Sequence, residues 1–316
     1  MITTAVILAA GRGSRLQAIT RTRSKALAPV VGMPLIARIM IELRGAGITS
    51  FHIVTAPHDA ELRQYFAADP TVITHIQEQP LGSGDALRSC QGHMSGAFLV
   101  CACDSVVESS EIRSLLETAR GVDGAMALGV MEVPPEVSLE SRSVVLLEGK
   151  RVVDIIEKPG PNERRTNITS LPLYVLSKDI FPELEKLPRS KRGEYELPEA
   201  IRNVIGRGGM VVSSRVSARD DVTALVDLLM LNMKVLEKLT PRVQIADGVV
   251  IPPTVSLVSP VCIDSGVSIG EGAILGPSVY LESGSVVEAG VRLERVIVTR
   301  GSRATRNTRD EVVVPS

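Results

Sequence analysis

The sequence predicts an α/β domain with a mostly parallel sheet, residues 1–239, followed by a short left-handed parallel β-helix, residues 240–316. Two observations support this prediction. Strand-like and helix-like patterns alternate through the first part of the chain, which is typical of a Rossmann-like sheet covered by helices. In the second part an aliphatic residue recurs every six positions, and repetition at a short fixed period is typical of a solenoid.

The first domain opens with an apolar strand over residues 5–10, and a helix is expected over 35–46. Further strands and helices are expected to alternate at 51–55, 60–67, 97–103, 110–120 and 125–130. Ligands of such sheets bind beyond the carboxyl ends of the strands. We therefore expect a site in the loops that follow Ala10 and Cys103. Helical periodicity over 221–239 predicts a helix that leads into the second domain.

The six-residue period of the second domain predicts side chains that fill the inside of a triangular coil. The repeating residues are Ile245, Ile251, Leu257, Ile263, Ile269, Leu275, Leu281, Val287 and Leu293. A second aliphatic series is expected on the flat outer faces and open end, with some members pointing inward: Val249, Val255, Val261, Val267 and Val279.

Charge and cysteine usage limit the classes of partner. The formal net charge is −1, so no overall field attracts nucleic acid or a membrane surface, and neither is expected as a partner. An anionic ligand must then be held by local cations and backbone amides. The four cysteines have no CxxC spacing and follow no signal peptide, which indicates reduced thiols and a cytoplasmic protein.

A glycine-rich turn, residues 8–16, follows the first strand, and its backbone amides can bind phosphate oxygens. It is neither a dinucleotide fingerprint nor a Walker loop. Together with the next residues it resembles the signature of sugar-1-phosphate nucleotidyltransferases (NDP-sugar pyrophosphorylases), G-x-G-[ST]-R-[LM], P-K-x-L-x-P and G-x-P-[LM]. The matching residues are Gly11, Gly13, Ser14, Arg15, Leu16, Lys25, Leu27, Pro29, Gly32 and Pro34. Ser24 and Ala18 depart from the usual prolines.

This resemblance implies an enzyme of nucleotide-sugar biosynthesis. It would transfer a nucleoside monophosphate from a nucleoside triphosphate to a sugar-1-phosphate, or to a sugar-like cyclitol phosphate, and release pyrophosphate. Arg15 and Lys25 would be catalytic, since a planar guanidinium suits bridging phosphates and a compact ammonium suits the reacting phosphoryl group. Nucleotide contacts are implied at Leu8, Ala10, Gly11, Gly13 and Ser14.

Residues 75–87 resemble the segment that reads the nucleobase in this family, Q/E-x-x-x-L-G-T-[AG]-x-A. The resemblance implies base contacts from Gln77, Gly82 and Ser83, with Gln79 as the alternative glutamine. The stretch Glu78-Gln-Pro-Leu-Gly-Ser-Gly is closer to guanylyltransferases. The G-T-G-x-A pattern also occurs in uridylyltransferases, so GTP is favoured slightly over UTP.

The metal site of the family corresponds to two aspartates. Asp104 follows an apolar strand, where the family has a catalytic Asp that binds Mg²⁺. Asp221 matches the first position of D-x-G-T-P-x-D-L-x-x-A-N, although the adjacent Asp220 is an alternative. Magnesium takes one or two carboxylates together with phosphate oxygens, which suits such a pair.

Sugar-phosphate contacts are implied at Glu157, Lys158, Asn167 and Ser170, within matches to the E-K-P and S-N-x-x-x-x-G-[IL]-Y strands of the family. Residues 193–197 match G-E-[YF]-[EQ]-[IL], which helps to form the sugar side. The family usually has a Tyr-Gly pair where this chain has residues 141–143, Ser-Arg-Ser. The acceptor therefore need not be an ordinary hexose phosphate, and heptose and cyclitol phosphates stay open.

Two other functions fit the same pattern. A non-catalytic regulatory subunit would keep the fold and bind nucleotide sugars, but such subunits tend to lose the cationic and metal positions present here. A bifunctional enzyme would transfer an acyl group in the coil with a histidine base, but all four histidines lie in the first domain. No candidate site residue lies beyond Asp221. We therefore expect the coil to support a homo-oligomer rather than catalysis.

Overall fold

The computed structural model describes residues 1–122 and 124–315, which form two compact units. The first unit comprises Met1–Arg12 and Ile39–Arg219, and the second comprises Gly13–Arg38 and Asp220–Ser316. This grouping differs from the predicted division at residue 239, because the segment Gly13–Arg38 and the helix before residue 240 group with the coil. The boundary between Arg38 and Ile39 falls within helix α2 (Leu35–Gly45).

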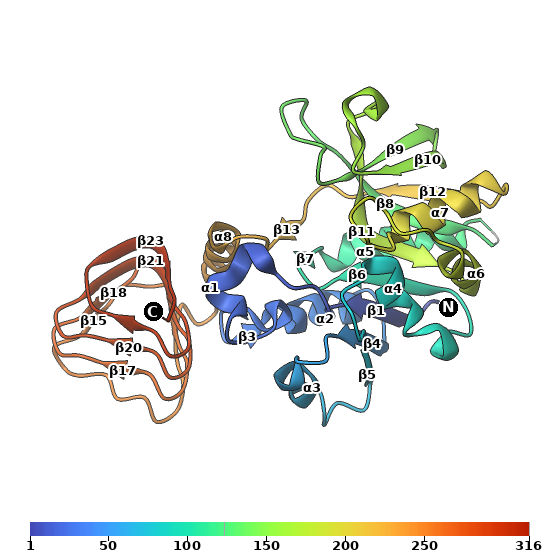
Figure 1. Cartoon of the computed structure of the whole chain (residues 1–316). Coiled ribbons are helices and arrows are strands. Elements are labelled where there is room, and N and C mark those ends of the chain that lie inside the picture. Colours follow the sequence, from blue (N-terminus) through green and yellow to red (C-terminus); the bar gives the residue numbers. More distant parts are fainter. Residues whose placement is uncertain (123, 316) are drawn as a thin grey trace. The chain divides into compact units, whose positions relative to one another are not determined.

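The first unit contains a sheet of nine strands within the described part of the chain, in the order β5-β4-β1-β6-β11-β8-β12-β10-β9 (Figure 1). Its strands are β1 (Thr4–Leu8), β4 (Ser50–Thr55), β5 (Val72–Ile76), β6 (Phe98–Ala102), β8 (Met126–Glu132), β9 (Ser143–Glu148), β10 (Arg151–Glu157), β11 (Ile168–Leu176) and β12 (Val211–Arg215). A short strand β7 (Ser105–Val106) follows β6.

Strand direction divides this sheet into two parts. Strands β5, β4, β1 and β6 are all parallel. Strands β4, β1 and β6 read as nearly continuous apolar runs because both of their faces are buried, whereas the edge strand β5 is partly exposed. Strand β11 runs antiparallel to both β6 and β8, and β10 runs antiparallel to β12 and β9. The expected parallel order therefore holds for the part that carries the glycine-rich turn, whereas the other part is mixed.

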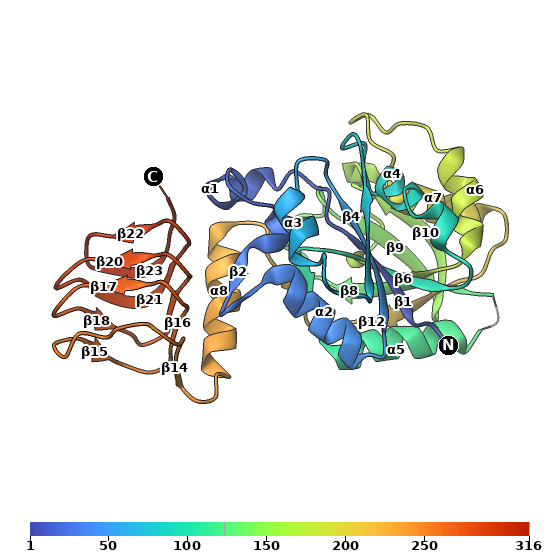
Figure 2. The ribbon, with the colours of Figure 1, turned by 90° about the horizontal axis from the view of Figure 1, so that it is seen from below.

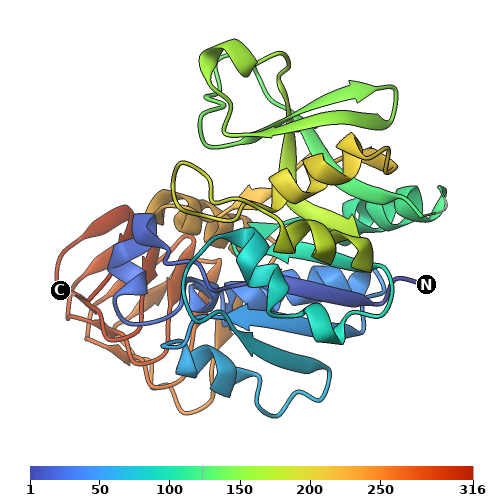
Figure 3. The ribbon, with the colours of Figure 1, turned by 45° about the vertical axis from the view of Figure 1, so that its right-hand side comes forward.

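Five α-helices of the described residues lie wholly in the first unit. They are α3 (Ala60–Tyr65), α4 (Ser83–Arg88), α5 (Ser109–Arg120), α6 (Phe181–Glu185) and α7 (Leu197–Gly206). Helix α5 buries Ile112, Leu115, Leu116 and Ala119, a helical spacing that forms one apolar face against β8 and β12. Helix α7 packs against β10 beside the projecting β9–β10 hairpin (Figure 3).

Three histidines form a cluster in this unit. His52 on β4 and His75 on β5 are buried, and His52 Nδ1 lies 2.8 Å from His75 Nε2. The ring of His93 lies 4.8 Å from that of His75, centroid to centroid. Burial lowers the pKa of His52 to about 4, and the neighbouring rings lower it in the same direction. Burial and His93 likewise lower the pKa of His75.

We expect this cluster to make the protein sensitive to acid. Because the folded-state pKa of His52 lies below its unfolded value of 6.5, the unfolded chain binds more protons between the two values. The contribution of His52 to the free energy of unfolding should be fully present above pH 6.5. It should fall by about 1.4 kcal/mol per pH unit as the pH drops toward 4. Thermal melts across this range check the slope. His52→Gln should flatten it, and the exposed His58→Gln should not; equal slopes in all three proteins would contradict the assignment.

The second unit begins with the segment Gly13–Arg38, which we call the signature segment. Its elements are η1 (Ser14–Leu16), α1 (Gln17–Thr20), η2 (Lys25–Leu27), β2 (Pro29–Val30) and β3 (Met33–Pro34). It is joined by β13 (Asp220–Asp221) and α8 (Leu225–Glu237). The helix expected over 221–239 therefore begins later, because Asp227 Oδ2 accepts hydrogen bonds from the amides of Thr223 and Ala224 and fixes the start of α8.

The remainder of the unit is a parallel β-helix, as the hexad period predicts (Figure 1). Val261 pairs in parallel with Val279, which pairs in the same way with Val296, so successive coils stack. The strands are β14 (Val243–Ile245), β15 (Ser256–Leu257), β16 (Val261–Ile263), β17 (Ser268–Ile269), β18 (Ile274–Leu275), β19 (Val279–Leu281), β20 (Val286–Val287), β21 (Arg292–Val298), β22 (Arg303–Ala304) and β23 (Thr308–Val313).

The interior of the coil contains most of the predicted hexad residues, from Ile263 to Leu293. Ile245 is an exception, because it lies in the first strand and keeps 39% of its surface exposed. The second valine series also belongs to this core. Val261, Val267 and Val279 are buried and the other two pack against them, so the expectation that this series lies on the outer faces is wrong.

One outer wall of the coil is apolar and buried instead. Tyr280 and Ile297 lie beside each other on neighbouring strands and are 1% and 0% exposed. Helix α8 packs against β19, β21 and β23, and Figure 2 shows it alongside this wall. The coil and α8 therefore share one packed interface. Among the described residues, no helix has the length and apolar character needed to cross a bilayer.

Candidate active site

The first part of the site lies at the carboxyl edge of the parallel strands. Leu8 on β1 pairs with Ala102 on β6, and Cys103 donates its backbone N–H to the Leu8 carbonyl at 3.2 Å. The chain after β6 thus runs beside the start of the glycine-rich turn, which places half-buried Asp104 next to it. Ala10 is buried, whereas Gly11 is exposed and a Cβ there would meet no atom within 4 Å.

The two predicted catalytic cations lie on the signature segment. Arg15 is exposed in η1, and Lys25 is half-buried at the start of η2. Gly13 has a φ of 59°, and a Cβ on it would lie 2.8 Å from Thr20 Cγ2 and 3.2 Å from Lys25 Cβ. The stem of Lys25 therefore packs on the Gly13 backbone. This contact explains why glycine is needed at this position of the motif.

Gln77 is held in a fixed orientation. Its Nε2 donates to the Gly82 carbonyl at 3.1 Å and to Asp85 Oδ2 at 2.8 Å, and its backbone N–H donates to Thr55. Both donors of the amide group are therefore used by acceptors within the unit. The remaining polar atom, Oε1, is a hydrogen-bond acceptor, which suits the N–H edge of a nucleobase. Asp85 was not identified from the sequence, because only the structure reveals its contact with Gln77.

Gly82 and Ser83 link this segment to residues 194–197. Gly82 has a φ of 102°, and a Cβ there would lie 2.7 Å from the Tyr195 carbonyl oxygen, so only glycine fits. Tyr195 donates its N–H to the Leu81 carbonyl and accepts from the Gly84 N–H, both at 2.7 Å. The Ser83 hydroxyl accepts from the Leu197 amide at 3.0 Å and thereby caps α7. The base-reading segment is thus fixed by the predicted sugar-side motif.

Several predicted sugar-phosphate residues come together at the end of β10. Lys158 Nζ lies 3.1 Å from Glu157 Oε1 and 3.3 Å from Glu196 Oε1. Ser143 on the neighbouring strand donates to Glu157 Oε2, and Ser143 also pairs with Ser170 on β11. One ammonium and two carboxylates in a half-buried cluster can bind both hydroxyl groups and a phosphate.

Burial controls the electrostatics of this cluster. It raises the pKa of Glu196, and the Lys158 ammonium offsets only part of the rise. It also raises the pKa of Tyr174, and the Glu157 carboxylate acts in the same direction. Tyr174 is hydrogen bonded to Ser170. Neither Tyr174 nor Glu196 was assigned an individual contact from the sequence, although both lie in matched motifs.

Asn167 has a different environment from these residues. Its Nδ2 donates to the Val133 carbonyl at 3.1 Å and to Glu132 Oε1 at 3.3 Å. Both acceptors lie at the end of β8. The structure thus brings Glu157, Lys158 and Ser170 together, and it places the side chain of Asn167 on the neighbouring strand end.

Carboxylates are available for a divalent metal. Asp104 and Asp221 are both half-buried, and oxygen donors are the ligands that hard cations prefer. Asp220 forms an ion pair with Lys234 at 2.6 Å, so its charge is already matched. The described residues contain no cluster of three or more His, Cys, Asp or Glu able to hold a metal. Each carboxylate offers oxygen donors of the kind that Mg²⁺ prefers, whereas the described residues form no closed protein site for a metal.

Comparison with known proteins shows the family. The nucleotidyl transferase family model matches residues 4–238. The chain is 27% identical over 262 residues to the bifunctional protein GlmU of Methanococcus maripaludis, covering 83% of this chain and 60% of that protein. It is 29% identical over 234 residues to the UTP–glucose-1-phosphate uridylyltransferase YngB of Bacillus subtilis, covering 63% of this chain and 78% of that protein.

A solved structure of UDP-glucose pyrophosphorylase complexed with UDP-glucose has the same fold. It aligns with a TM-score of 0.69 at 23% sequence identity, covering 76% of this chain and 100% of that one. The chain spans 60% of the length of GlmU, so only part of that protein is represented. The family model, in contrast, covers both the glycine-rich turn and helix α8. The chain therefore belongs to the nucleotidyl transferase family.

Proposed function

We propose that this protein is a sugar-1-phosphate nucleotidyltransferase. A phosphate oxygen of the acceptor attacks the α-phosphorus of a nucleoside triphosphate, a new P–O bond forms, and the bond to the β-phosphate breaks. The products are an NDP-sugar, or the corresponding cyclitol derivative, and pyrophosphate. The observation that carries the proposal is the family match over residues 4–238, which includes every residue assigned a role.

The chain's own groups supply positioning and charge neutralisation. Arg15 and the amides from Gly11 to Ser14 hold the triphosphate, and Lys25 neutralises charge that develops at the reacting phosphates. Asp104 and Asp221 would hold Mg²⁺, which would neutralise phosphate charge when it is bound. Asp221 is assigned as the second ligand because it matches the first position of the family segment D-x-G-T-P-x-D-L-x-x-A-N.

The acceptor is bound by the cluster at the end of β10. Lys158 faces the phosphate of the acceptor. Glu157 accepts hydrogen bonds from the acceptor's hydroxyl groups, and Ser170 donates a hydrogen bond to one of them. Ser143 stands near the position where the family usually has a glycine, and its hydroxyl bonds to Glu157. This polar edge favours an acceptor rich in hydroxyl groups, a hexose, heptose or cyclitol phosphate.

The nucleotide is UTP or GTP. Gln77 Oε1 is an acceptor, and the N3–H of uracil and the N1–H of guanine are both donors that it can bind. Similarity to the uridylyltransferase YngB supports UTP, whereas the sequence of residues 78–84 is closer to guanylyltransferases. The two bases differ in size, so a direct competition experiment separates them.

The experiment that tests this function is a pyrophosphate-release assay. Four nucleoside triphosphates are each combined with hexose-, heptose- and cyclitol-phosphates in the presence of Mg²⁺, and then with Mn²⁺ or with a chelator. Pyrophosphate release that needs both substrates and a divalent metal supports the proposal. Nucleotide-sugar binding without turnover in any combination would replace it with a non-catalytic regulatory role.

Gln77→Ala should reduce the preference for the correct nucleotide. A hydrogen bond to the base is worth about 1 kcal/mol, so the ratio of kcat/KM values for the best and next-best nucleotides should shrink roughly fivefold. The matched control is Gln79→Ala, which alters the other glutamine of the segment. An unchanged ratio in Gln77→Ala together with a reduced one in Gln79→Ala would transfer the role to Gln79.

The proposed function also includes a compartment and an oligomeric state. We infer a cytoplasmic homo-oligomer, since reduced thiols and a coil with an open end favour this arrangement. Light scattering on the purified chain measures its mass, and a monomer at micromolar concentration would contradict the oligomer.

A further inference from the structure

The signature segment is built into the same compact unit as the β-helix. Its β2–β3 hairpin is attached to helix α8 through Asn232, which accepts from the Val31 amide and donates to the Pro29 carbonyl, each at 3.0 Å. Asn232 is fully buried. Since α8 packs on the wall of the coil, the hairpin, the helix and the coil form one connected body.

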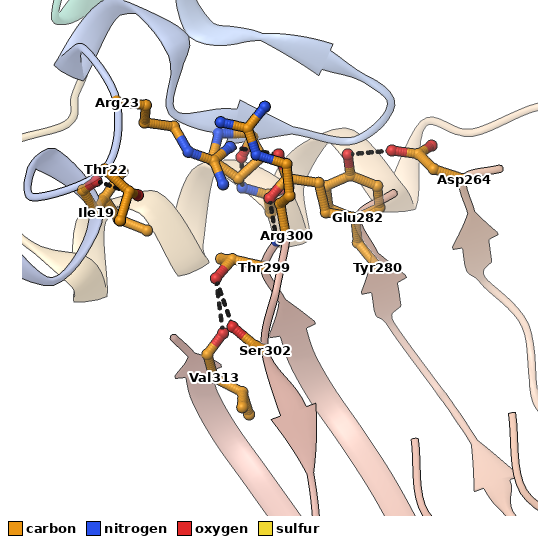
Figure 4. A network of polar contacts seen from close by, with 12 residues as sticks. Ile19, Thr22, Arg23, Asp264, Tyr280, Glu282, Thr299, Arg300, Ser302 and Val313 are labelled. Atoms are coloured by element: carbon orange, nitrogen blue, oxygen red, sulfur yellow. Dashed lines mark hydrogen bonds and ion pairs between the residues drawn. The ribbon is translucent and has the colours of Figure 1, made fainter. Parts of the chain in front are cut away.

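A buried ion pair joins the segment directly to the coil. The guanidinium of Arg23 donates to Glu282 Oε1, and the two side chains are only 4% and 12% exposed (Figure 4). The other oxygen of Glu282 accepts from the Arg300 amide at 2.7 Å. The side chain of Glu282 is thus fixed by the backbone of the next turn of the coil. Removing one member of such a buried pair leaves an uncompensated charge, so the contact restrains the chain around Arg23 strongly.

A second attachment lies on the other side of Lys25. Tyr280 donates its hydroxyl hydrogen to Asp264 Oδ2 at 2.6 Å (Figure 4). The backbone of Gly32 hydrogen bonds to the same tyrosine. Tyr280 lies on β19, and Asp264 directly follows the neighbouring strand β16. The coil therefore fastens the segment at Arg23 and again at Gly32.

Lys25 lies between these two attachments and two residues from Arg23. The turn that carries it is tight, with hydrogen bonds from the Leu27 amide to the Ser24 carbonyl and from the Ala28 amide to the Lys25 carbonyl. The Lys25 stem also rests on Gly13, next to Arg15. A displacement of Arg23 must therefore be transmitted to both candidate catalytic cations.

We propose that Glu282 of the β-helix is a positioning residue for nucleotidyl transfer: it anchors Arg23 and thereby sets the place of Lys25. This inference rests on the proposed function and reverses the expectation that the coil supports only assembly. It also extends the site to a residue far beyond Asp221, the last candidate in the sequence. Glu282 lies in the coil and acts through Arg23 of the signature segment, without a contact of its own to the substrates.

The test compares Glu282→Gln, Arg23→Gln and the double variant with the unsubstituted protein. Misplacement of a reacting group by about 1 Å can cost up to about a hundredfold in rate, so each single variant should lose about ten- to a hundredfold in kcat. KM for the acceptor should stay within about twofold. The double variant should be no slower than the single ones, because both remove the same contact.

Glu288→Gln is the matched control, since Glu288 pairs with Arg303 elsewhere on the coil. It should retain the kcat of the original protein. Arg23→Lys keeps the charge and should recover part of the activity lost in Arg23→Gln. Full kcat in Glu282→Gln, or an equal loss in Glu288→Gln, would overturn the positioning role. If Glu282→Gln does not fold, the comparison of Arg23→Lys with Arg23→Gln decides, and equal rates in those two would also overturn it.

Hydrogen exchange separates this inference from the proposed function. Amides of residues 14–28 should exchange faster in Glu282→Gln than in the original protein, while those of α8 should be unchanged. This readout does not depend on turnover. If the original protein releases no pyrophosphate with any substrate pair, the proposed function fails but the anchoring can still be measured. Unchanged exchange in residues 14–28 would overturn the anchoring itself.

Discussion

Replacing Lys25 with alanine should lower kcat by about a hundred- to a thousandfold, the usual cost of removing one group that stabilises developing charge. Lys25 lies half-buried in η2 with its stem on Gly13, so its ammonium is held in place before substrate binds. The loss should appear mainly in kcat, since charge accumulates at the α-phosphorus in the transition state. Steady-state kinetics with saturating nucleotide and acceptor measure the effect.

Arg21→Ala is the control for this substitution. Arg21 is an exposed cation of the same segment, and its removal should leave kcat within about twofold. The melting temperature of both variants should remain close to that of the original protein. A Lys25→Ala variant with full activity would remove the main support for the proposed chemistry, because Lys25 is the residue assigned to neutralise charge at the reacting phosphates.

Asp104→Asn and Asp221→Asn should each reduce turnover by about a hundredfold or more. Loss of a ligand weakens charge neutralisation that is worth several kcal/mol, and each 1.4 kcal/mol is a factor of ten in rate. The residual activity should need a higher concentration of divalent metal than the original protein. A titration of rate against Mg²⁺ concentration, supported by metal binding measured by calorimetry, checks both effects.

Asp220→Asn provides the comparison for the second position. It breaks the exposed pair with Lys234, which should cost well under 1 kcal/mol of stability and leave the rate nearly unchanged. A normal rate in Asp221→Asn and a large loss in Asp220→Asn would shift the ligand by one residue. Normal rates and an unchanged metal requirement in all three variants would contradict a carboxylate metal site.

Features with a strong local pattern could be predicted from the sequence. Helix α5 and strands β4 and β6 lie within one or two residues of their expected bounds, because their apolar spacing matches the period of each element. The hexads from Ile263 to Leu293 fill the coil, as their six-residue period predicts. In contrast, the start of α8 was placed too early, since apolar spacing alone could not show that Asp227 caps the helix.

Long-range contacts could not be predicted in the same way. The sequence identified Gln77 but not Asp85, which orients it, and identified Lys25 but not the pair of Arg23 and Glu282. A charged residue in a repeat usually lies on a solvated face, and no spacing rule connects two residues so far apart. The valine series of the coil was placed partly outside for a related reason. The period shows which residues repeat, but packing decides which of them face inward.

The proposed reaction transfers the α-phosphate of the nucleotide, with its nucleoside, to the acceptor phosphate. Two parallel reactions test it, one with a nucleoside triphosphate labelled at the α-phosphate and one with the same nucleotide labelled at the γ-phosphate. We expect the α label in the nucleotide-sugar product and the γ label in pyrophosphate. Transfer of the γ label to the acceptor, or its release as inorganic phosphate without a labelled nucleotide-sugar, would contradict the proposed reaction.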